Sequence, residues 1–495
     1  AIGVQPRTLE VFEGMGVLRQ VLDASVQIRG QIMYVNGTEV GRMDIVVPAD
    51  VPFQFIGLPQ YATERILRER LHALGGVIER GLRLDTFKER DSEVIATLSG
   101  PVGEETVHAQ YLVGCDGAHS VVRKTLGLSF EGAAFEEQYM LGDVEVDWTQ
   151  PRGYGIRATH QTDGAVDDIL VAIPLPGRKR YRVSMLVPED LASAPPASKD
   201  AVAHGFEGER KPTLAHIQAV FDRMAPEPTR ASNLRWSSVF RISHRIVDAY
   251  GRGRVFVAGD AAHIHPPTGA QGMNTGIQDS HNLAWKLALA VQGHAAPGLL
   301  ESYDAERRPV GEEVVGRTVR DAREGIGSDS NDPNYVVRRE AQLLIDYAGS
   351  PVLGGDGGES GIHAGQRAPD AFGLNREVVN FPIRLFDLFG RLDHTLLVYV
   401  GTATSADELD EIERVAAAAA GLANGHLEAY LIAAPQAEVG TTLLPLVRDA
   451  AGEFAQTYTV SGTSIFVVRP DGYLGFASRS LTFEDLVEYL KLTFR

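Results

Sequence analysis

The stretch VFVAGDAAHIHPPTGAQGMNTGIQD, residues 255–279, joins an apolar strand to a helix through an unusual connection. The connection contains an Asp, two prolines, four glycines and an Asn. Glycine loses more conformational freedom on folding than any other residue, so four glycines in one short segment are too costly for packing alone. We infer that the segment brings the backbone close to a flat, charged ligand.

The residue types of this connection suit a ligand with hydroxyl groups and negative charge. Gly259 and Asp260 end the strand, at the edge where doubly wound sheets bind ligands. A carboxylate only accepts hydrogen bonds, as a ribityl-type hydroxyl requires. Residues 266–269 stiffen a turn and then allow a close approach, and the free N–H groups of residues 272–274 favour an anion. A plain strand–turn–helix connector with a capping Asn is the alternative.

Composition narrows the class of partner. The chain has 495 residues and a net charge of −18, from 47 basic and 65 acidic residues. This excess of acidic residues argues against nucleic acid as a binding partner, because a protein that binds nucleic acid needs a basic face. It also argues against binding to an anionic membrane surface. No apolar run approaches the ~18 residues that span a bilayer.

The single cysteine, Cys115, ends an apolar strand and is expected to be a small core residue. We expect a cytoplasmic protein.

Hydrophobic periodicity outlines the remaining elements. Residues 7–22 read as a helix interrupted by glycines, and residues 61–74 as an amphipathic helix. Residues 107–115 read as a strand buried on both faces. Strands over 168–175 and 181–187 and a helix over 213–225 follow, and a helix over 278–293 comes after the connection. Beyond a Gly- and Asp-rich segment, strands and helices alternate to the end of the chain.

The segment GDAAHIHPPTGAQGMNTGIQDSHNLAWKL, residues 259–287, closely resembles the second flavin-binding motif of the class A aromatic hydroxylases. This is the FAD monooxygenase family of para-hydroxybenzoate hydroxylase and phenol hydroxylase. The resemblance implies that Asp260 holds the ribityl chain of FAD. It also implies that Gly272, Met273 and Asn274 face the N1/C2 edge of the isoalloxazine, where reduced flavin carries negative charge.

Two further segments match the same family. YLVGCDGAHSVVRKTLG, residues 111–127, resembles its DG motif, which lies near the FAD pyrophosphate and the approach of the nicotinamide nucleotide. A strand ending in a tight turn and a helix cap is the alternative. Gln60 stands before a helix, like the family's ribityl-binding glutamine, although alone it reads as a polar cap. The implied cofactor-binding residues are Gln60, Asp116, Gly117, Arg123, Gly259, Asp260, Pro267, Gly272, Met273 and Asn274.

The resemblance implies an α/β fold with an α+β substrate domain. A Rossmann-like FAD-binding domain is expected over residues 1–140 and 245–325, a substrate-binding sheet domain over 141–244, and a linker over 326–368. Residues 369–495 resemble a thioredoxin-like domain without CxxC. Thiol redox chemistry there is excluded because it needs a thiolate, so dimer contact or covering the active site is the expected role.

The sequence departs from the family at its start. The family opens with a strand, Gly-x-Gly-x-x-Gly and a helix, and residues 1–495 contain no such unit. A βαβ dinucleotide unit takes ~30 residues, so we expect it just upstream of Ala1, either in a longer chain or missing from the record. A decayed homologue is the alternative. Without the adenine half of the site, we expect poor flavin binding.

The reaction implied by the resemblance uses NADPH or NADH to reduce FAD. O₂ then adds at flavin C4a, and the hydroperoxide delivers OH to an electron-rich ring, usually a phenol. No side chain is required as an acid or base. His263 and His265 lack a third metal ligand and are expected to pack at the flavin site. Tyr154, Tyr181 and Arg182 are candidates for substrate contact, with ordinary sheet residues as the alternative.

Two alternatives to an aromatic hydroxylase follow from the same motifs. The first is another flavoenzyme on this scaffold: a ketone-level oxygenase, an epoxidase or a reductase. The second is a catalytically dead protein in which only packing or the C-terminal domain matters. Product analysis after reaction with labelled O₂ distinguishes the flavoenzymes of the first alternative from one another. Absence of bound flavin in a full-length form favours the second alternative, the catalytically dead protein. A homodimer is an open possibility for either.

Overall fold

The computed structural model describes residues 1–192, 202, 204–207, 211–324, 330–355, 361–390, 392–480 and 483–495, which form two compact units. Unit 1 comprises residues 1–48, 53–277 and 311–341, and unit 2 comprises residues 49–52, 278–310 and 342–495. Two helices, α6 (Gln271–Gln292) and α7 (Ser302–Glu324), are each divided between the two units.

A small sheet in unit 1 carries three helices around one apolar core. Strands β1 (Gly3–Val4), β5 (Ile56–Gly57) and β2 (Val26–Gln27) pair in that order. Helices α1 (Pro6–Gly14), α2 (Leu18–Asp23) and α3 (Gln60–Ala73) confirm the predicted interrupted helix and the predicted second helix. Their core consists of Val4, Leu9, Phe12, Val17, Val21, Ile56, Leu58, Ala62 and Ile66.

The second sheet of unit 1 has three short strands, in the order β16, β17, β9. Strand β9 (Leu112–Gly114) lies parallel to β17 (Val255–Val257), and β16 (Gly251–Arg252) pairs antiparallel with β17. Helix α4 (Val121–Thr125) follows β9. A separate meander contains β6 (Arg83–Glu89), β7 (Val94–Gly100) and β8 (Gly103–Ala109). The strand predicted over 107–115 is therefore divided between β8 and β9.

The placement of Cys115 corrects the expectation of a core thiol. The apolar run ends with β9 at Gly114, and Cys115 is exposed in the following turn. The prediction of a buried small residue was wrong because the run of apolar letters continues one residue beyond the strand.

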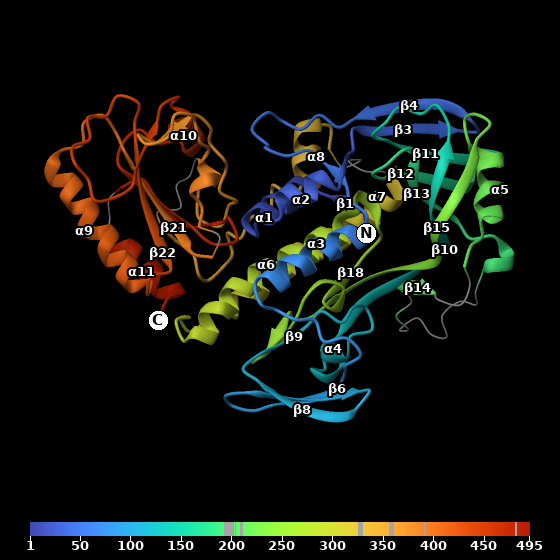
Figure 1. Ribbon diagram of the computed structural model, residues 1–495, viewed down its shortest axis with the longest axis horizontal. Coiled ribbons are helices and arrows are strands. Elements are labelled where there is room, and N and C mark those ends of the chain that lie inside the picture. Colours follow the sequence, from blue (N-terminus) through green and yellow to red (C-terminus); the bar gives the residue numbers. More distant parts are fainter. Residues whose placement is uncertain are drawn as a thin grey trace. The chain divides into compact units, whose positions relative to one another are not determined.

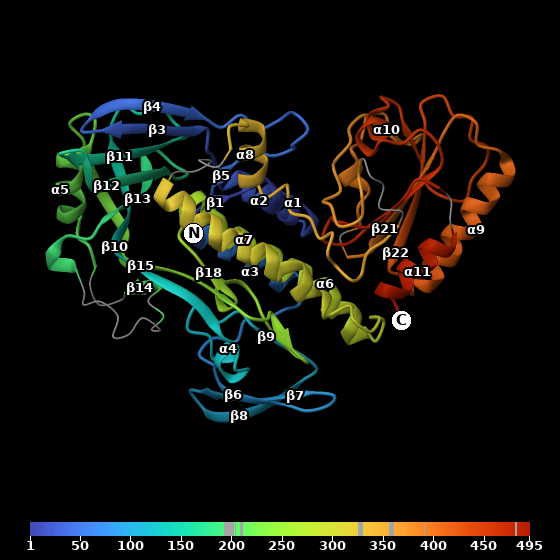
Figure 2. The same cartoon turned by 180° about the vertical axis from the view of Figure 1, so that it is seen from behind.

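The largest sheet of unit 1 has nine strands, with β14, β15, β10, β13, β12, β11, β3 and β4 in order and β18 beside β15. Helix α5 (Leu214–Met224) covers one face, where Ile217, Phe221 and Met224 pack against the strands (Figures 1 and 2). The predicted strands over 168–175 and 181–187 are confirmed as β12 and β13. The strands are β3 (Gly30–Val35), β4 (Thr38–Asp44), β10 (Phe130–Asp147), β11 (Tyr154–Thr162), β12 (Ala165–Pro174), β13 (Arg180–Leu186), β14 (Gly205–Glu207), β15 (Arg230–Val247) and β18 (His263–Ile264).

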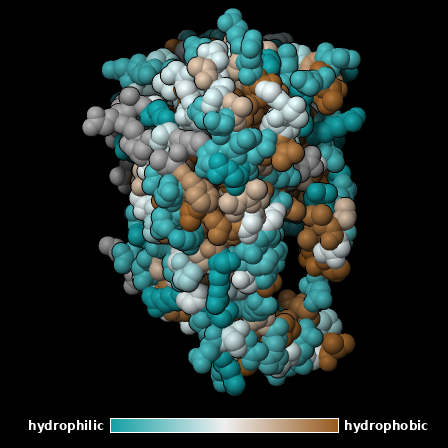
Figure 3. All heavy atoms as spheres, turned by 90° about the vertical axis from the view of Figure 1, so that its left-hand side faces the viewer, coloured by the Kyte–Doolittle hydropathy of each residue, from teal (hydrophilic) through white to brown (hydrophobic). Residues whose placement is uncertain are grey.

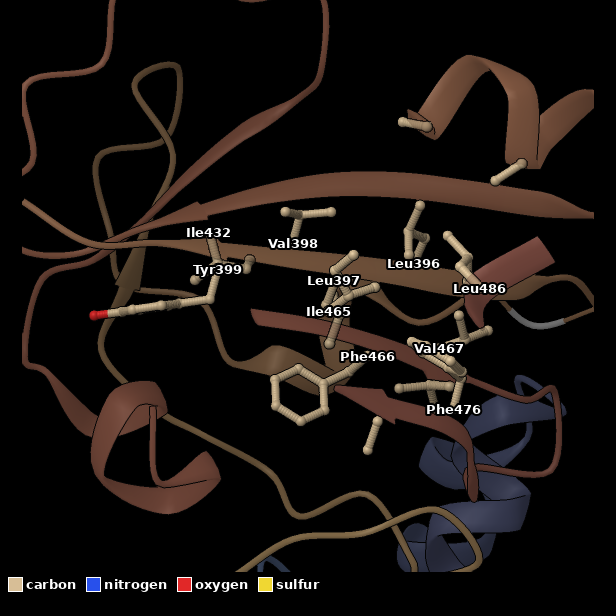
Figure 4. Packing of buried hydrophobic residues seen from close by; sticks show 14 of the residues in the cluster. Leu396, Leu397, Val398, Tyr399, Ile432, Ile465, Phe466, Val467, Phe476 and Leu486 are labelled. Atoms are coloured by element: carbon tan, nitrogen blue, oxygen red, sulfur yellow. The ribbon is translucent and has the colours of Figure 1, made fainter. Parts of the chain in front are cut away.

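Unit 2 is built on a mixed seven-stranded sheet in the order β19, β25, β24, β21, β22, β23, β20. Its central strand, β21 (His394–Val400), is buried at every position, as a strand covered on both faces requires. Figure 4 shows Leu397, Ile465 and Phe466 packed in this core. The other elements are β19 (Gly354–Gly355), β20 (Leu374–Asn375), β22 (Leu427–Ala433), β23 (Leu446–Asp449), β24 (Ser464–Val468), β25 (Leu474–Ser478), α9 (Ala406–Leu422), α10 (Glu453–Tyr458) and α11 (Phe483–Thr493).

Two elements differ from their predicted bounds. Helix α6 begins at Gln271 rather than at residue 278, so residues 272–274 lie in its first turn. Within the predicted linker over 326–368, helix α8 (Pro333–Glu340) forms behind its capping Asp332, whose carboxylate accepts from the N–H of Asn334. Residues 326–329 and 356–360 of that segment are outside the described ranges.

The face of the molecule drawn in Figure 3 has a mixed character. In Figure 3, hydrophobic side chains lie in small groups among predominantly hydrophilic ones. Among the described residues, none of the helices has the length and apolar character needed to cross a membrane.

Candidate functional site

The parallel pairing of β9 and β17 brings two sequence motifs to one edge. Val257 lies opposite Gly114, and the N–H of Ala258 donates to the carbonyl of Gly114 at 3.1 Å. Because both strands run in the same direction, the chain leaves both at the same edge. Asp116 follows β9 there, and Asp260 follows β17. This is the edge at which open α/β sheets bind ligands.

Asp116 caps helix α4. Its Oδ2 accepts hydrogen bonds from the N–H groups of Val121, at 2.7 Å, and Val122, at 3.2 Å. Gly117 has a φ of +77°, which suits the tight turn between β9 and the helix. The helix-cap alternative of the sequence analysis is therefore present. Asp116 is exposed.

Arg123 joins the two motifs. Its guanidinium donates to the carbonyl of Ala118 at 2.8 Å and to that of Ala261 at 3.1 Å, so one side chain holds the turn after β9 and the turn after β17. The guanidinium also lies over the ring of Phe130, 3.9 Å from its centroid. Burial lowers the pKa of Arg123, and the charge of Asp116 opposes that shift.

The start of α6 approaches the end of β17 closely. Gly259 has a φ of +59°, and a Cβ on Gly276 would lie 3.1 Å from the Cα of Gly259. A side chain at Gly276 would press on the backbone of Gly259, whereas Gly259 itself is required for its positive φ. Sequence analysis singled out Gly259 but not Gly276, although Gly276 lies within the quoted motif.

Asn274 links the start of α6 to the beginning of the chain. Its buried side chain donates to the carbonyls of Gly3, at 3.0 Å, and Ala270, at 2.7 Å. Its Oδ1 accepts from the N–H of Gln5 at 3.1 Å, and Gln5 Nε2 donates to the carbonyl of Gly269 at 2.7 Å. The side chain of Asn274 therefore positions the loop before α6. Nothing in the sequence indicated Gln5.

The first turn of α6 presents its backbone to the site. The first four N–H groups of an α-helix have no acceptor within the helix, and the dipole makes this end positive. Gly272 and Met273 belong to this turn, and the Met273 side chain packs against the core of α1 and α3. Gly272 has no side chain and that of Met273 is engaged in this core, so both residues present only backbone groups at the helix start. Pro267, in the preceding turn, is exposed.

His265 lies directly behind Gly272. A Cβ on Gly272 would be 3.3 Å from His265 Nε2, which is buried and has no hydrogen-bond partner among the described residues. Its Nδ1 lies 3.0 Å from the carbonyl of Pro266, so Nδ1 carries the proton and Nε2 has a lone pair. Burial, reinforced by His263, lowers the pKa of His265 to about 3. The rings of His263 and His265 stack on each other, with their centroids 6.0 Å apart.

Gln60 and Asp260 lie around the first residue of the chain. Gln60 Oε1 accepts from the nitrogen of Ala1 at 2.9 Å, and Gln60 Nε2 donates to Glu64 at 2.8 Å. Burial lowers the pKa of the Ala1 amino group to about 6, as does the charge of Arg182, while the charge of Asp260 opposes the shift.

Arg182 belongs to a row of side chains across three strands. It faces Asp143 of β10 in register and forms a bidentate ion pair with it, in which Arg182 Nη2 lies 2.9 Å from Asp143 Oδ2. Its guanidinium also lies 4.5 Å from the ring centroid of Trp236 of β15. The other two candidates differ. Tyr181 packs in the core, and the Tyr154 hydroxyl donates to Asp44 at 2.6 Å.

This constellation fits a flavin. Two strand ends, a helix N-terminus and closely approaching glycines surround one edge, and a buried imidazole lone pair lies behind it. The free N–H groups of the first helical turn suit the electron-rich carbonyl edge of an isoalloxazine, and Asp260 suits ribityl hydroxyls. Among the described residues, no three His, Cys, Asp or Glu side chains are grouped as metal ligands.

Comparison with known proteins identifies the class. A family model described as "FAD binding domain" matches residues 1–318. The chain belongs to this family, and it is an FAD-dependent monooxygenase of the class A aromatic hydroxylases.

Individual relatives agree with this assignment. The chain is 30% identical to a flavin-dependent monooxygenase of Mycobacteroides abscessus, over 99% of this chain and 90% of that protein. It is 31% identical to pentachlorophenol 4-monooxygenase of Sphingobium chlorophenolicum, over 83% of this chain and 74% of that protein. The fold is similar to that of the flavin-dependent monooxygenase PieE, solved with FAD and substrate, with a TM-score of 0.79 at 22% identity over 99% of this chain and 92% of that chain. The predicted fold class is confirmed.

Proposed function

We propose that this protein hydroxylates a phenolic or other small aromatic substrate, using NADPH or NADH and O₂. The observation that carries the proposal is the meeting of both strand ends with the first turn of α6 at one edge. Supporting it, a relative that shares 31% identity acts on a chlorinated phenol by name.

The proposed cofactor contacts follow from the geometry of that edge. The N–H groups of Gly272 and Met273 hold the carbonyl edge of the isoalloxazine. The carboxylate of Asp260 accepts from ribityl hydroxyls, and the amide of Gln60 accepts from them or donates to them. Asp116 faces the phosphate side while capping α4. Gly259 and Pro267 shape the backbone, and Gly117 turns it. Arg123 and Asn274 act as positioning residues, because their side chains are engaged with backbone groups.

When bound, FAD supplies hydride acceptance from the nicotinamide and activation of O₂ for transfer of one oxygen atom. The chain's own residues bind, orient and exclude water. We propose that the substrate ring lies against the row formed by Asp143, Arg182 and Trp236. The guanidinium of Arg182 is held flat by its carboxylate and indole partners, so it offers a fixed edge to a phenolic oxygen.

The test uses the purified full-length protein. The purified protein is expected to show flavin absorption bands in the visible, and phenols are expected to accelerate its NADPH or NADH oxidation. With ¹⁸O₂, the hydroxylated product is expected to carry one labelled oxygen. An absence of flavin bands after addition of FAD, or an unlabelled product, would overturn the proposal.

A further inference from the structure

Helix α8 ends beside the first residue of α6 and the turn that precedes it. Gln271 Nε2 donates to Glu340 Oε2 at 2.9 Å and lies 3.3 Å from the backbone carbonyl of Glu340. Gly269, with a φ of +67°, passes so close that a Cβ would lie 2.8 Å from Glu340 Oε2. The carboxylate therefore fills the space beneath the turn formed by residues 268–271.

The carboxylate of Glu340 is itself fixed from the other side. Its Oε1 accepts from Arg317 Nη1 at 3.2 Å and from Arg339 Nη2 at 3.4 Å. Arg317 is buried on α7, so this ion pair is less screened than a surface pair. Burial raises the pKa of Glu340, as does Asp321, while Arg317 and Arg339 oppose the shift. One oxygen thus faces the cations and the other faces the loop.

The residue after α8 contacts a second part of the same site. The N–H of Arg7, in the first turn of α1, donates to the carbonyl of Ala341 at 3.2 Å. Gln5, two residues earlier, donates to the carbonyl of Gly269. The end of α8, the start of α1 and the loop before α6 therefore form a closed ring of hydrogen bonds.

We propose that Glu340 is a positioning residue of the flavin site, which fixes the loop of residues 266–271 and so aims the first N–H groups of α6. This inference rests on the proposed function. Segment 333–341, which the sequence analysis placed in a linker, is then part of the cofactor site. The carboxylate acts through Gln271 and the turn at Gly269 and does not touch the cofactor.

The experiment compares three variants of the full-length holoprotein. Glu340→Ala removes both carboxylate contacts, and Glu340→Gln keeps an oxygen that can accept from Gln271. Glu313→Gln is the matched control, because Glu313 lies 3.3 Å from the same Arg317 guanidinium, on the exposed side and away from the loop. Each variant is titrated with FAD by quenching of flavin fluorescence, and the visible spectrum of bound flavin is recorded with the urea midpoint.

For Glu340→Ala we expect the Kd for FAD to rise on the order of tenfold and the bound-flavin bands to shift, since a hydrogen bond to a charged group is lost. Glu340→Gln is expected to restore the spectrum and most of the affinity, and Glu313→Gln to leave both unchanged. If Glu340→Ala does not fold, Gln271→Leu removes the same bond while leaving the ion pair with Arg317, and the same rise in Kd is expected.

The outcomes separate this inference from the proposed function. A wild-type protein that binds no FAD overturns both. A wild-type protein that binds FAD, beside a folded Glu340→Ala or Gln271→Leu variant with unchanged Kd and spectrum, overturns this inference alone. A lowered urea midpoint with an unchanged spectrum also overturns it, because that result describes a purely structural role.

Discussion

The two parts of helix α6 lie in contrasting environments. Its first turns, in unit 1, are surrounded by glycines, amides and backbone carbonyls, with Asn274 and Gly276 as examples. Its later turns, in unit 2, carry Asp279, Asn282 and Lys286 into a fully buried cluster of charges. One continuous helix thus contains a region suited to a ligand and a region suited to structure.

The charges of the buried cluster are matched. Glu306 accepts from Lys286 at 2.8 Å, from Asn282 at 2.7 Å, from Ser350 at 2.7 Å and from Arg469 at 2.7 and 2.9 Å. Burial lowers the pKa of Lys286 to about 8, against the opposing charge of Glu306. Such a cluster has little capacity for a ligand because its oxygens already have partners. The first turn of α6 has that capacity, because its N–H groups lack intrahelical acceptors.

The largest expected effect comes from breaking the buried cluster. Glu306→Gln removes the carboxylate and leaves Lys286 and Arg469 buried without it. Removing one partner of a buried ion pair costs about 3–5 kcal/mol, so the free energy of unfolding in urea is expected to fall by that amount.

Glu488→Gln is the matched control for this variant. Glu488 pairs with Lys491 at 2.7 Å on the exposed surface of α11, and such pairs contribute only about 0–1 kcal/mol. Equal losses in the two variants would contradict the structural role given to the cluster.

Two buried histidines extend the comparison to pH. Burial, with smaller contributions from His263 and Arg469 respectively, lowers the pKa of His265 and of His394 to about 3. Both folded-state values lie below the usual pKa of about 6.5, so the unfolded chain binds protons that the folded chain does not. The stability that each neutral ring contributes is therefore present above about pH 6.5 and is lost as the pH falls toward 3.

The expected slope is about 1.4 kcal/mol per pH unit for each histidine between these limits. The free energy of unfolding is measured from pH 4 to 7 for His265→Gln and for His394→Gln. Each substitution is expected to lower the slope of this free energy against pH by the contribution of one histidine. Because His265 lies behind the proposed flavin site, His265→Gln is also expected to weaken FAD binding, whereas His394→Gln is not. A slope that neither substitution changes would rule out these two rings as its source.

The sequence predicted local structure here better than side-chain partners. Helix α3 and the strand–turn–helix at residues 255–292 follow from periodicity and turn residues, which act over a few positions. The contact of Asn274 with Gly3 joins residues 271 positions apart. The contact of Glu340 with Gln271 joins an apparent linker to a motif. Such pairings depend on tertiary packing, which no short stretch encodes.

The smallest expected effect tests the glycines at the start of α6. Gly276→Ala would place a Cβ 3.1 Å from the Cα of Gly259, which is backbone and cannot turn aside. Overpacking of this kind costs about 1–3 kcal/mol, and we expect the Kd for FAD to rise about tenfold as the helix start moves from the strand end.

Gly316→Ala on α7 is the control for Gly276→Ala, because a Cβ there meets no atom within 4 Å. Alanine favours a helix over glycine by about 1 kcal/mol, so this variant is expected to stabilise the fold and leave FAD binding unchanged. If Gly276→Ala lowers the free energy of unfolding while Gly316→Ala raises it, helix propensity cannot explain both results. The close contact with Gly259 would then be the reason that residue 276 is a glycine. If Gly276→Ala bound FAD as tightly as wild type, the contact between Gly259 and Gly276 would not shape the cofactor site.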